Sequence, residues 1–509
     1  MEENLGLIAA ENSLYKILLS IINRIGALIF TIYLARVLLP ELFGIYTLAL
    51  SIALIFYTFT DLGINLTLSR YVSMELNKKK NRARAYARYL FKLKLFLVLL
   101  FSFSLLAFSY PLSFFIFKKP QLFLPLIFSA FYILIFSLDG FFGTFFYIIK
   151  KVKYLVIKET LVQALRIFLV IMLFSFVAKT FYVASAFISQ IVSIFFALTL
   201  SIFWLGKLMP KLLSKSQEKI DKKGLLKFSF LMTISSISTV FFIYIDTIML
   251  GLLLPDPSFV GYYRAAFSIV ISVSSLLLLN FVFLPIFSQT PQRKLRRIFN
   301  KVMRYSFALT IPSVFGLIVL GKYVLRLLYG YEYLLSYLPL IFLSFIIIET
   351  SSGGLLYSLL SAKGKLKNVT LALISVTFLN IILNFLLISW LKSYSFELGM
   401  VGASIATLTS RAVYFLCLIF LVKKELNLAL KIKNILKPLI ASLIMFFSLS
   451  LIKSQIYDMN LIFGILLVFS GILIYFLFLL LLKGIDKKDF EFMGVSENKF
   501  LNYLFFIKK

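Results

Sequence analysis

The stretch YLARVLLPELFGIYTLALSI, residues 33–52, joins two apolar runs through a short Leu-Leu-Pro-Glu turn. Both runs extend beyond the quoted residues far enough to cross a bilayer, which takes about 20 predominantly apolar residues. Pro restricts the helix around it and is typical of a helix boundary. The pattern predicts two membrane-spanning helices, over 13–37 and 43–68, that meet near Pro40.

The same pattern returns in the second half of the chain. Leu38-Leu39-Pro40-Glu41 is matched by Leu253-Leu254-Pro255-Asp256, and residues that follow are matched at one fixed spacing, among them Gly44 by Gly261 and Tyr46 by Tyr263. A repeat in the same orientation predicts two pseudo-symmetric six-helix lobes, over 1–227 and 228–437, and two further helices with a cytoplasmic tail over 438–509. Two such lobes suit an alternating-access mechanism.

The composition predicts an all-α membrane protein. Hydrophobic residues make up 61% of the 509 residues and charged residues 15%, which leaves room for about fourteen transmembrane helices and no large water-soluble domain. Cys417 is the single Cys and there is no His. These counts exclude disulfide frameworks, zinc sites and imidazole proton relays, so no metal site is expected.

The formal charge of +32 is concentrated in alternate inter-helix segments. The positive-inside rule places these segments and both termini in the cytoplasm, which indicates a multi-pass protein of the cell membrane. Attraction to anionic membrane lipids explains the basic segments better than nucleic-acid binding does. The segments are Arg70 to Arg88, Lys150 to Lys153, Lys207 to Lys223, Arg293 to Lys301, Lys363 to Lys367 and Lys423 to Lys433.

Ionisable residues inside the predicted spans are the candidate functional residues. Each costs roughly 2.5–3.5 kcal/mol at depth in the membrane on insertion scales, and so should face a cavity, a partner or the surface. The four Arg could bind phosphate oxygens or snorkel to headgroups, and the four acids could couple transport to an ion, act as gates or simply pair with an Arg. The residues are Arg24, Arg166, Arg264 and Arg411, and Asp61, Asp139, Asp246 and Glu349. Asn380 and Asn384, one turn apart, could touch substrate or join helices.

The chain resembles the polysaccharide or O-antigen flippases of the multidrug/oligosaccharidyl-lipid/polysaccharide exporter superfamily. The resemblance rests on an ordered set of stretches: residues 33–52 with TDLGINLTLSRY (60–71), YIDTIMLG (244–251) with VGYYRAAFSI (260–269), and LYGYEY (328–333). LSAKGKLKN (360–368), LNIILNFLLI (379–388) and MVGASIAT (400–407) complete it. The acidic N-terminus, with Glu2, Glu3 and Glu11, departs from many members.

The resemblance implies a non-enzymatic flippase that moves a polyprenyl-pyrophosphate-linked oligosaccharide from the cytoplasmic to the outer leaflet. It implies a cationic central cavity with Arg24 in it, and Arg166, Arg264 and Arg411 as further assignments. A cation-coupled multidrug exporter of the same fold is the alternative. No cofactor is expected, and the coupling ion is left open between a proton and a sodium ion. A single chain is expected to act on the lipid-linked oligosaccharide alongside polysaccharide-assembly enzymes.

Overall fold

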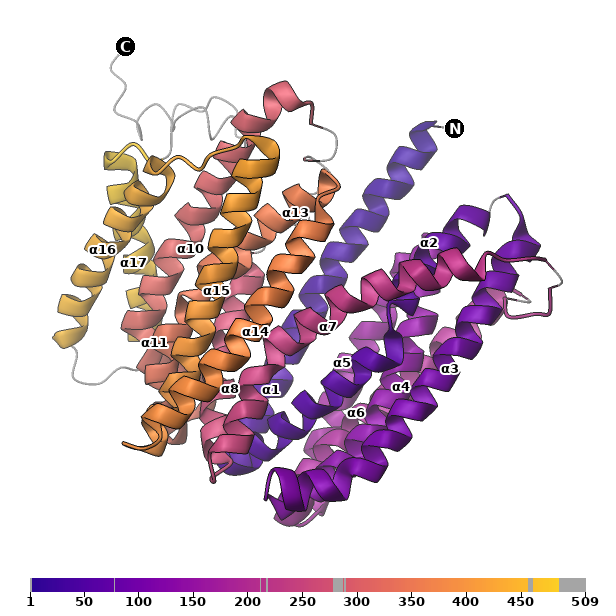
Figure 1. The fold of residues 1–509 in the computed structure, drawn as a ribbon. Helices are drawn as coiled ribbons and strands as arrows, with labels where there is room; N and C mark the ends of the chain where they lie inside the picture. The colour runs from indigo at the N-terminus through magenta and orange to yellow at the C-terminus, as the bar shows by residue number, and fades with distance from the viewer. Residues whose placement is uncertain are drawn as a thin grey trace. The chain divides into compact units, whose positions relative to one another are not determined.

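The computed structural model describes residues 2–484, apart from 77, 211, 217, 278–286, 288–289 and 456–460, and all its regular elements in that range are helical (Figure 1). Within it, eleven helices are long and apolar enough to cross a membrane, or twelve if Tyr331–Ser344 and Ile346–Ala362, bent by 46°, form one span. The predicted all-α membrane architecture is confirmed, and the residues of the predicted tail after 484 lie outside the described range.

The main helices follow in chain order. They are α1 (Glu2–Asp61), α2 (Ile64–Leu76), α3 (Lys80–Pro111), α4 (Phe123–Ile148), α5 (Val152–Phe176), α6 (Tyr182–Leu208), α7 (Lys222–Leu253), α8 (Ser258–Leu276), α10 (Gln292–Tyr329), α11 (Tyr337–Ser344), α12 (Ile346–Ile348), α13 (Gly354–Ala362), α14 (Leu366–Leu391), α15 (Phe396–Leu426), α16 (Lys433–Ser454) and α17 (Leu461–Leu481).

The predicted count of fourteen spans is not confirmed, and two places account for part of the difference. The helix labelled α1 consists of two helices that meet at a kink at Leu39, whose φ is 57°, beside Pro40, which agrees with the boundary predicted there. The whole stretch Leu14–Leu76 is nevertheless one of the eleven candidate spans. The α5 helix is 25 residues long, carries Lys158, Glu159 and Arg166, and is not among the eleven. Fourteen spans stay a prediction.

Packing divides the chain into two compact units that differ from the predicted lobes. Unit 1 comprises Met1–Arg264 and Leu373–Ala403, and unit 2 comprises Ala265–Ala372 and Ser404–Lys509. The contacts of most of α14 and the start of α15 thus group with the first half of the chain. The lobes 1–227 and 228–437 with the segment 438–509 are sequence boundaries that stay predictions.

Unit 1 is built around α4. This helix packs against α3 and α6, while α5 packs against α6 and α1 (Figure 1). Leu90, Phe141 and Phe145 belong to its buried apolar cluster. Ser137 and Ser189 are fully buried, and small side chains of this kind let helices approach closely where no hydrophobic effect drives them together.

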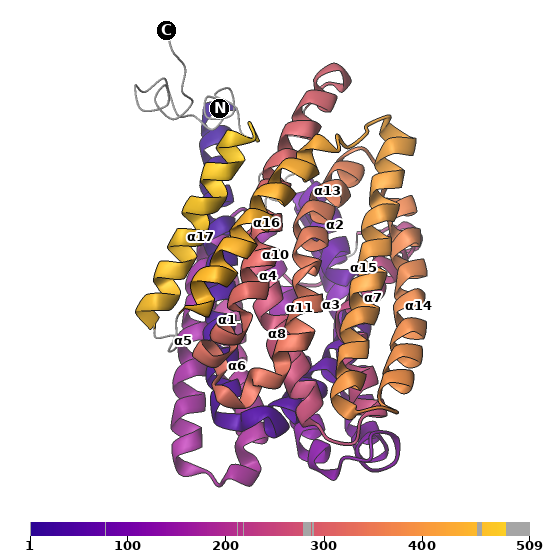
Figure 2. The ribbon, with the colours of Figure 1, turned by 90° about the vertical axis from the view of Figure 1, so that its left-hand side faces the viewer.

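Unit 2 contains α16 and α17, and α10 packs against both (Figure 2). Met445, Leu467 and Tyr475 lie in the apolar cluster between these helices. The Tyr475 hydroxyl donates to the Ala308 carbonyl oxygen at 2.6 Å, which satisfies the phenol inside an apolar environment.

Within unit 1, Gly44 and Gly261 of the sequence repeat each pack against the backbone segment that precedes the other glycine. A Cβ added to Gly44 would overlap the carbonyl oxygen of Pro257, and a Cβ added to Gly261 would overlap the carbonyl oxygen of Pro40. The two contacts are equivalent in the repeat, since Pro40 and Pro257 are separated by the same number of residues as Gly44 and Gly261. The structure therefore aligns Pro40 with Pro257 instead of the predicted Pro255.

Gly44→Ala should lower the free energy of unfolding by about 1–3 kcal/mol, because its methyl group meets a backbone oxygen that cannot rotate away. Gly206→Ala on α6 is the matched control, since nothing lies within 4 Å of an added Cβ there and the change should be neutral or stabilising by up to about 1 kcal/mol. Thermal melting of the purified protein measures both. Equal melting temperatures for the two variants would contradict the close approach.

The C-terminal end of α7 is held by lysines. Lys119 Nζ donates to the carbonyl oxygens of Gly251 at 2.7 Å and Leu254 at 2.9 Å, and Lys392 Nζ donates to that of Leu253 at 3.4 Å. Positive charge at this end complements the helix dipole. Burial lowers the pKa of the Lys119 ammonium, and the nearby negative charge of Asp256 partly offsets this lowering. These contacts fix the helix that carries Asp246.

Candidate functional site

The predicted intramembrane acids Asp61, Asp139 and Glu349 each lie against a basic side chain. Lys94 Nζ lies 2.7 Å from Asp61 Oδ1, Lys158 Nζ lies 2.6 Å from Asp139 Oδ2, and Arg411 Nη1 lies 2.9 Å from Glu349 Oε2. Both lysines are almost fully buried, and Arg411 is 6% exposed. The pairs meet the requirement that a charge inside the membrane be compensated.

Unit 1 has a half-open cavity of about 390 Å³ between α1, α4, α5 and α6, with a mixed polar and apolar lining, called here the Arg166 cavity. It brings together two predicted residues, Arg166 and Asp139, on neighbouring helices of the unit. Its polar lining is completed by Asn23, Thr144, Lys158, Glu159, Gln163 and Gln190, and its aromatic lining by Tyr132, Phe136 and Tyr147.

Several polar atoms in the wall of the Arg166 cavity are buried with no hydrogen-bond partner among the described residues. They are Nε and Nη2 of Arg166, Oδ1 of Asp139 and Oε1 of Gln163. A buried unsatisfied group costs about 1–3 kcal/mol, so such groups are ordinarily matched by water or ligand. The Arg166 guanidinium also lies 4.5 Å from the centre of the Phe30 ring. These atoms have almost no accessible surface, so they lie within the wall and not on its open side.

Asp246 and Asn384 meet in a second buried cluster of unit 1. Asn384 Nδ2 donates to Asp246 Oδ1 at 2.7 Å, and the Tyr263 hydroxyl donates to Asp246 Oδ2 at 2.9 Å. Asn384 Nδ2 also donates to the Asn380 carbonyl oxygen at 2.9 Å. The structure thus gathers Asp246, Asn380 and Asn384, and adds Tyr263, which sequence analysis noted only as part of the repeat.

The Glu349–Arg411 pair sits at an irregular turn in unit 2. Glu349–Gly353 forms a π-helical segment between α12 and α13, a few residues after the 46° bend that separates Tyr331–Ser344 from Ile346–Ala362. Such π-bulges are frequent at functional sites because they re-aim side chains and weaken the helix locally. Ser306 and Ser352 share a hydrogen bond of 2.8 Å next to this turn. The pair is therefore placed on an element suited to bending.

The remaining two predicted Arg lie apart from the Arg166 cavity. Arg24 is half-buried on α1, and the described lining of that cavity includes its neighbour Asn23 instead. Arg264 is half-buried near the start of α8, with its guanidinium 5.4 Å from the centre of the Tyr244 ring. The substrate-binding roles predicted for Arg24, Arg264 and Arg411 stay predictions.

Sequence analysis missed Lys94 and Lys158 because it placed the starts of both spans too late. The third and fifth spans were predicted to begin at residues 95 and 159, whereas α3 begins at Lys80 and α5 at Val152. Arg82, Arg84 and Arg88, assigned to a basic inter-helix segment, accordingly lie on α3. Each of the two lysines lies within about one helical turn of an apolar run, and a span that could face it contains a carboxylate. This combination is the signal that could have found them.

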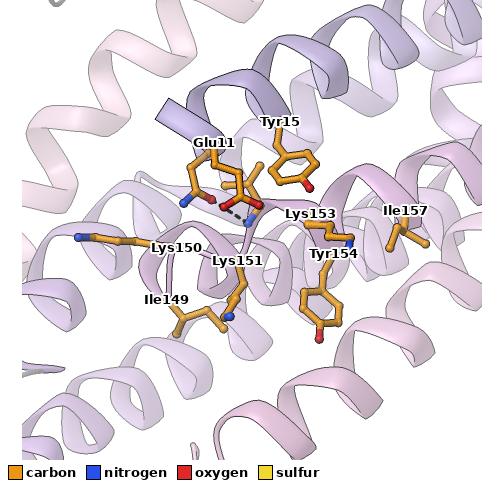
Figure 3. A pocket seen from close by; sticks show the side chains of 10 residues that line it. Glu11, Tyr15, Ile149, Lys150, Lys151, Lys153, Tyr154 and Ile157 are labelled. Atoms are coloured by element: carbon orange, nitrogen blue, oxygen red, sulfur yellow. Dashed lines mark hydrogen bonds between the residues drawn. The ribbon is translucent and has the colours of Figure 1, made fainter. Parts of the chain in front are cut away.

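A further cavity, of about 590 Å³, lies at the turn between α4 and α5 (Figure 3). Asn12 Oδ1 accepts a hydrogen bond from the Val152 backbone N–H at 3.2 Å and so caps the start of α5. Lys150 and Lys151 point away from each other around the opening. Exposed, diverging lysines fit the predicted attraction to anionic headgroups better than they fit a convergent binding site.

The fold is that of a multi-pass membrane protein, and solved transporter structures share it. The lipid II flippase MurJ, in an inward closed conformation, superimposes with a TM-score of 0.71 at 18% identity, covering 91% of this chain and 97% of that one. An inward-facing multidrug resistance MATE family transporter of the MOP superfamily matches with a TM-score of 0.60 at 13% identity, over 80% and 95%. At such identities the likeness concerns the fold alone.

The chain belongs to the polysaccharide biosynthesis protein family, whose model matches residues 9–291. A probable low-salt glycan biosynthesis flippase of Haloferax volcanii is 25% identical over 278 residues, which are 53% of this chain. The chain spans 57% of the length of that relative. The family resemblance in the sequence is confirmed.

Proposed function

We propose that the protein is a flippase that moves a polyprenyl-pyrophosphate-linked oligosaccharide from the cytoplasmic to the outer leaflet by alternating access, without changing a covalent bond. Membership of the polysaccharide biosynthesis protein family and the similarity to the probable glycan biosynthesis flippase of Haloferax volcanii support this proposal. The observation that carries it is the Arg166 cavity, a half-open cavity in an otherwise apolar helical unit, lined in part by charged and amide side chains. A hydrophilic head group that leaves water to cross the membrane needs polar side chains of this kind in place of its hydration shell.

The alternative, a cation-coupled multidrug exporter, is supported by the MATE fold but is disfavoured by the charge pairs. A lipophilic cation would be attracted by a carboxylate that lacks a basic partner. Here Lys94, Lys158 and Arg411 already occupy the carboxylates of Asp61, Asp139 and Glu349. A drug cation would have to displace a lysine or arginine, which is unfavourable for a group held at 2.6–2.9 Å.

An apolar groove in unit 2 suits the lipid part of such a substrate. The groove has a volume of about 650 Å³ and lies between α8, α10, α16 and α17. Its lining is almost entirely apolar, with Leu309, Leu317, Leu449, Ile472 and Phe476 among the contributors. Isoprenoid carbon chains pack on such surfaces without requiring a hydrogen bond. In this proposal the appended helices α16 and α17 guide the polyprenyl tail while the head group crosses.

The Asp246 cluster is the proposed coupling site for a proton or a sodium ion. Its carboxylate is buried and held by Tyr263 and Asn384 in defined geometry. Asn384 Oδ1 is buried with no hydrogen-bond partner among the described residues, so an oxygen is available to a cation beside the carboxylate. Carboxylate and amide oxygens are the ligands that hard cations prefer.

The proposed orientation follows the basic segments, which place both termini in the cytoplasm of a cell-membrane protein. Synthesis and polymerising enzymes would supply and consume the same lipid-linked substrate, and one chain would carry out transport.

The proposal is tested by the thermal stability of the purified protein with two ligands. A polyprenyl-pyrophosphate-linked oligosaccharide at 100 times its dissociation constant should stabilise the protein by about 2.7 kcal/mol, because it binds only the folded state. Tetraphenylphosphonium, a lipophilic cation, should leave the melting temperature unchanged. Stabilisation by tetraphenylphosphonium and not by the lipid-linked oligosaccharide would favour the multidrug exporter.

A further inference from the structure

The charges around the Arg166 cavity balance locally. Arg166 and Lys158 contribute two cations, and Asp139 and Glu159 contribute two carboxylates. Lys158 Nζ lies 2.6 Å from Asp139 Oδ2 and 3.3 Å from Glu159 Oε1, so it serves both acids. A pyrophosphate placed here would meet two carboxylates at short range. The cavity therefore does not suit the anionic part of a lipid-linked glycan.

The polar side chains that line the cavity are of both kinds. Arg166 and Lys158 offer N–H donors, Asp139 and Glu159 offer carboxylate acceptors, and the amides of Gln163 and Gln190 offer both. A cation could serve only the acceptors, and an anion only the donors. A hydroxyl group both donates and accepts. A ligand with neighbouring hydroxyl groups can therefore pair with both the donors and the acceptors.

Aromatic rings complete the site. The rings of Tyr132 and Phe136 are stacked, with centroids 5.3 Å apart and planes 10° from parallel, and both line the cavity. Apolar C–H faces of a sugar ring pack on aromatic side chains, while its hydroxyls point outward to polar groups. The volume of about 390 Å³ is at the small end of the usual range for small-molecule sites, about 300–1,000 Å³.

We propose that the Arg166 cavity is a sugar subsite that binds an uncharged ring of the glycan, and that the pyrophosphate binds elsewhere. The inference rests on the proposed flippase function and assigns the part of the substrate that this cavity receives. It changes the role predicted for Arg166 from phosphate binding to hydroxyl binding. It also makes Gln163 and Asn23, joined by a hydrogen bond of 3.2 Å from Gln163 Nε2 to Asn23 Oδ1, part of the recognition surface.

The test uses a cysteine placed in the cavity of the full-length protein. Cys417→Ser removes the single native thiol, and Thr144→Cys adds one to the cavity wall, where its alkylation rate is measured. The probes are glucose, galactose, mannose and N-acetylglucosamine, with inorganic pyrophosphate for comparison. At about ten times its dissociation constant, a bound sugar should slow alkylation about tenfold, and pyrophosphate should not. Adding Gln163→Leu should remove the protection.

Two further variants make the result decisive. Thr160→Cys, on the exposed side of α5, is the matched control and should react equally fast with and without sugar. Tyr147→Cys, a half-exposed residue of the cavity lining, replaces Thr144→Cys if the latter does not fold or react. Protection by pyrophosphate alone, or by none of the sugars, would overturn the sugar subsite.

Transport is measured on the same preparations to separate the two proposals. Flipping of a lipid-linked oligosaccharide without sugar protection would overturn the subsite and leave the flippase proposal standing. Sugar protection in a folded protein that flips no lipid-linked oligosaccharide would overturn the flippase proposal alone.

Discussion

Replacing Arg411 with Met should lower the free energy of unfolding by about 3–5 kcal/mol, because it leaves the Glu349 carboxylate buried without its basic partner. The added change Glu349→Gln removes the stranded charge and should restore most of the lost stability. Thermal melting of the single and double variants measures the effect. A single variant as stable as the unchanged protein would contradict the buried ion pair.

Transport by the same two variants separates binding from structure. If Arg411 holds a phosphate of the substrate, the double variant should fold normally and still fail to transport. If Arg411 serves only to neutralise Glu349, the double variant should recover transport with its stability. The first outcome is the one that the predicted substrate-binding role requires.

Asp246→Asn should abolish the dependence of transport on a cation gradient and slow transport about tenfold or more, since a buried charge-assisted hydrogen bond contributes roughly 1.5–3 kcal/mol. The side chain keeps its shape but loses the charge that would bind the ion. Rates are measured in liposomes with and without a proton or sodium gradient. Tyr263→Phe is the control, because it removes one hydrogen bond to Asp246 and leaves the carboxylate. Gradient dependence that survives in Asp246→Asn would contradict the coupling site.

The sequence could predict the helical membrane fold because composition and apolar run length act over whole spans. Pro40 predicted a boundary between two helices, and the chain kinks there, with Leu39 outside helical geometry. Errors arose at the ends of the spans. Lys94 and Lys158 were missed because the spans were predicted to begin just after them, and the cost of a lysine in the membrane falls when a carboxylate on a neighbouring helix lies within 2.7 Å.

The candidate site was predictable as a set of residues but not as a set of contacts. The sequence singled out Asp139, Arg166, Asp246 and Asn384 by depth in the membrane. It could not show that the first two share one cavity and the last two share one hydrogen bond, because both relations depend on how helices rotate about their axes. Neutral side chains such as Gln163 carry no such signal, since amides occur throughout helix interfaces.

The most direct test of the proposed activity is transbilayer movement in liposomes that contain only the purified protein. A defined polyprenyl-pyrophosphate-linked oligosaccharide is distributed over both leaflets, and an impermeant glycosidase added outside reports the accessible fraction. The account predicts that the protein makes the inner-leaflet pool accessible as well. A folded, correctly reconstituted protein that leaves the inner-leaflet pool protected, with or without an ion gradient, would contradict it.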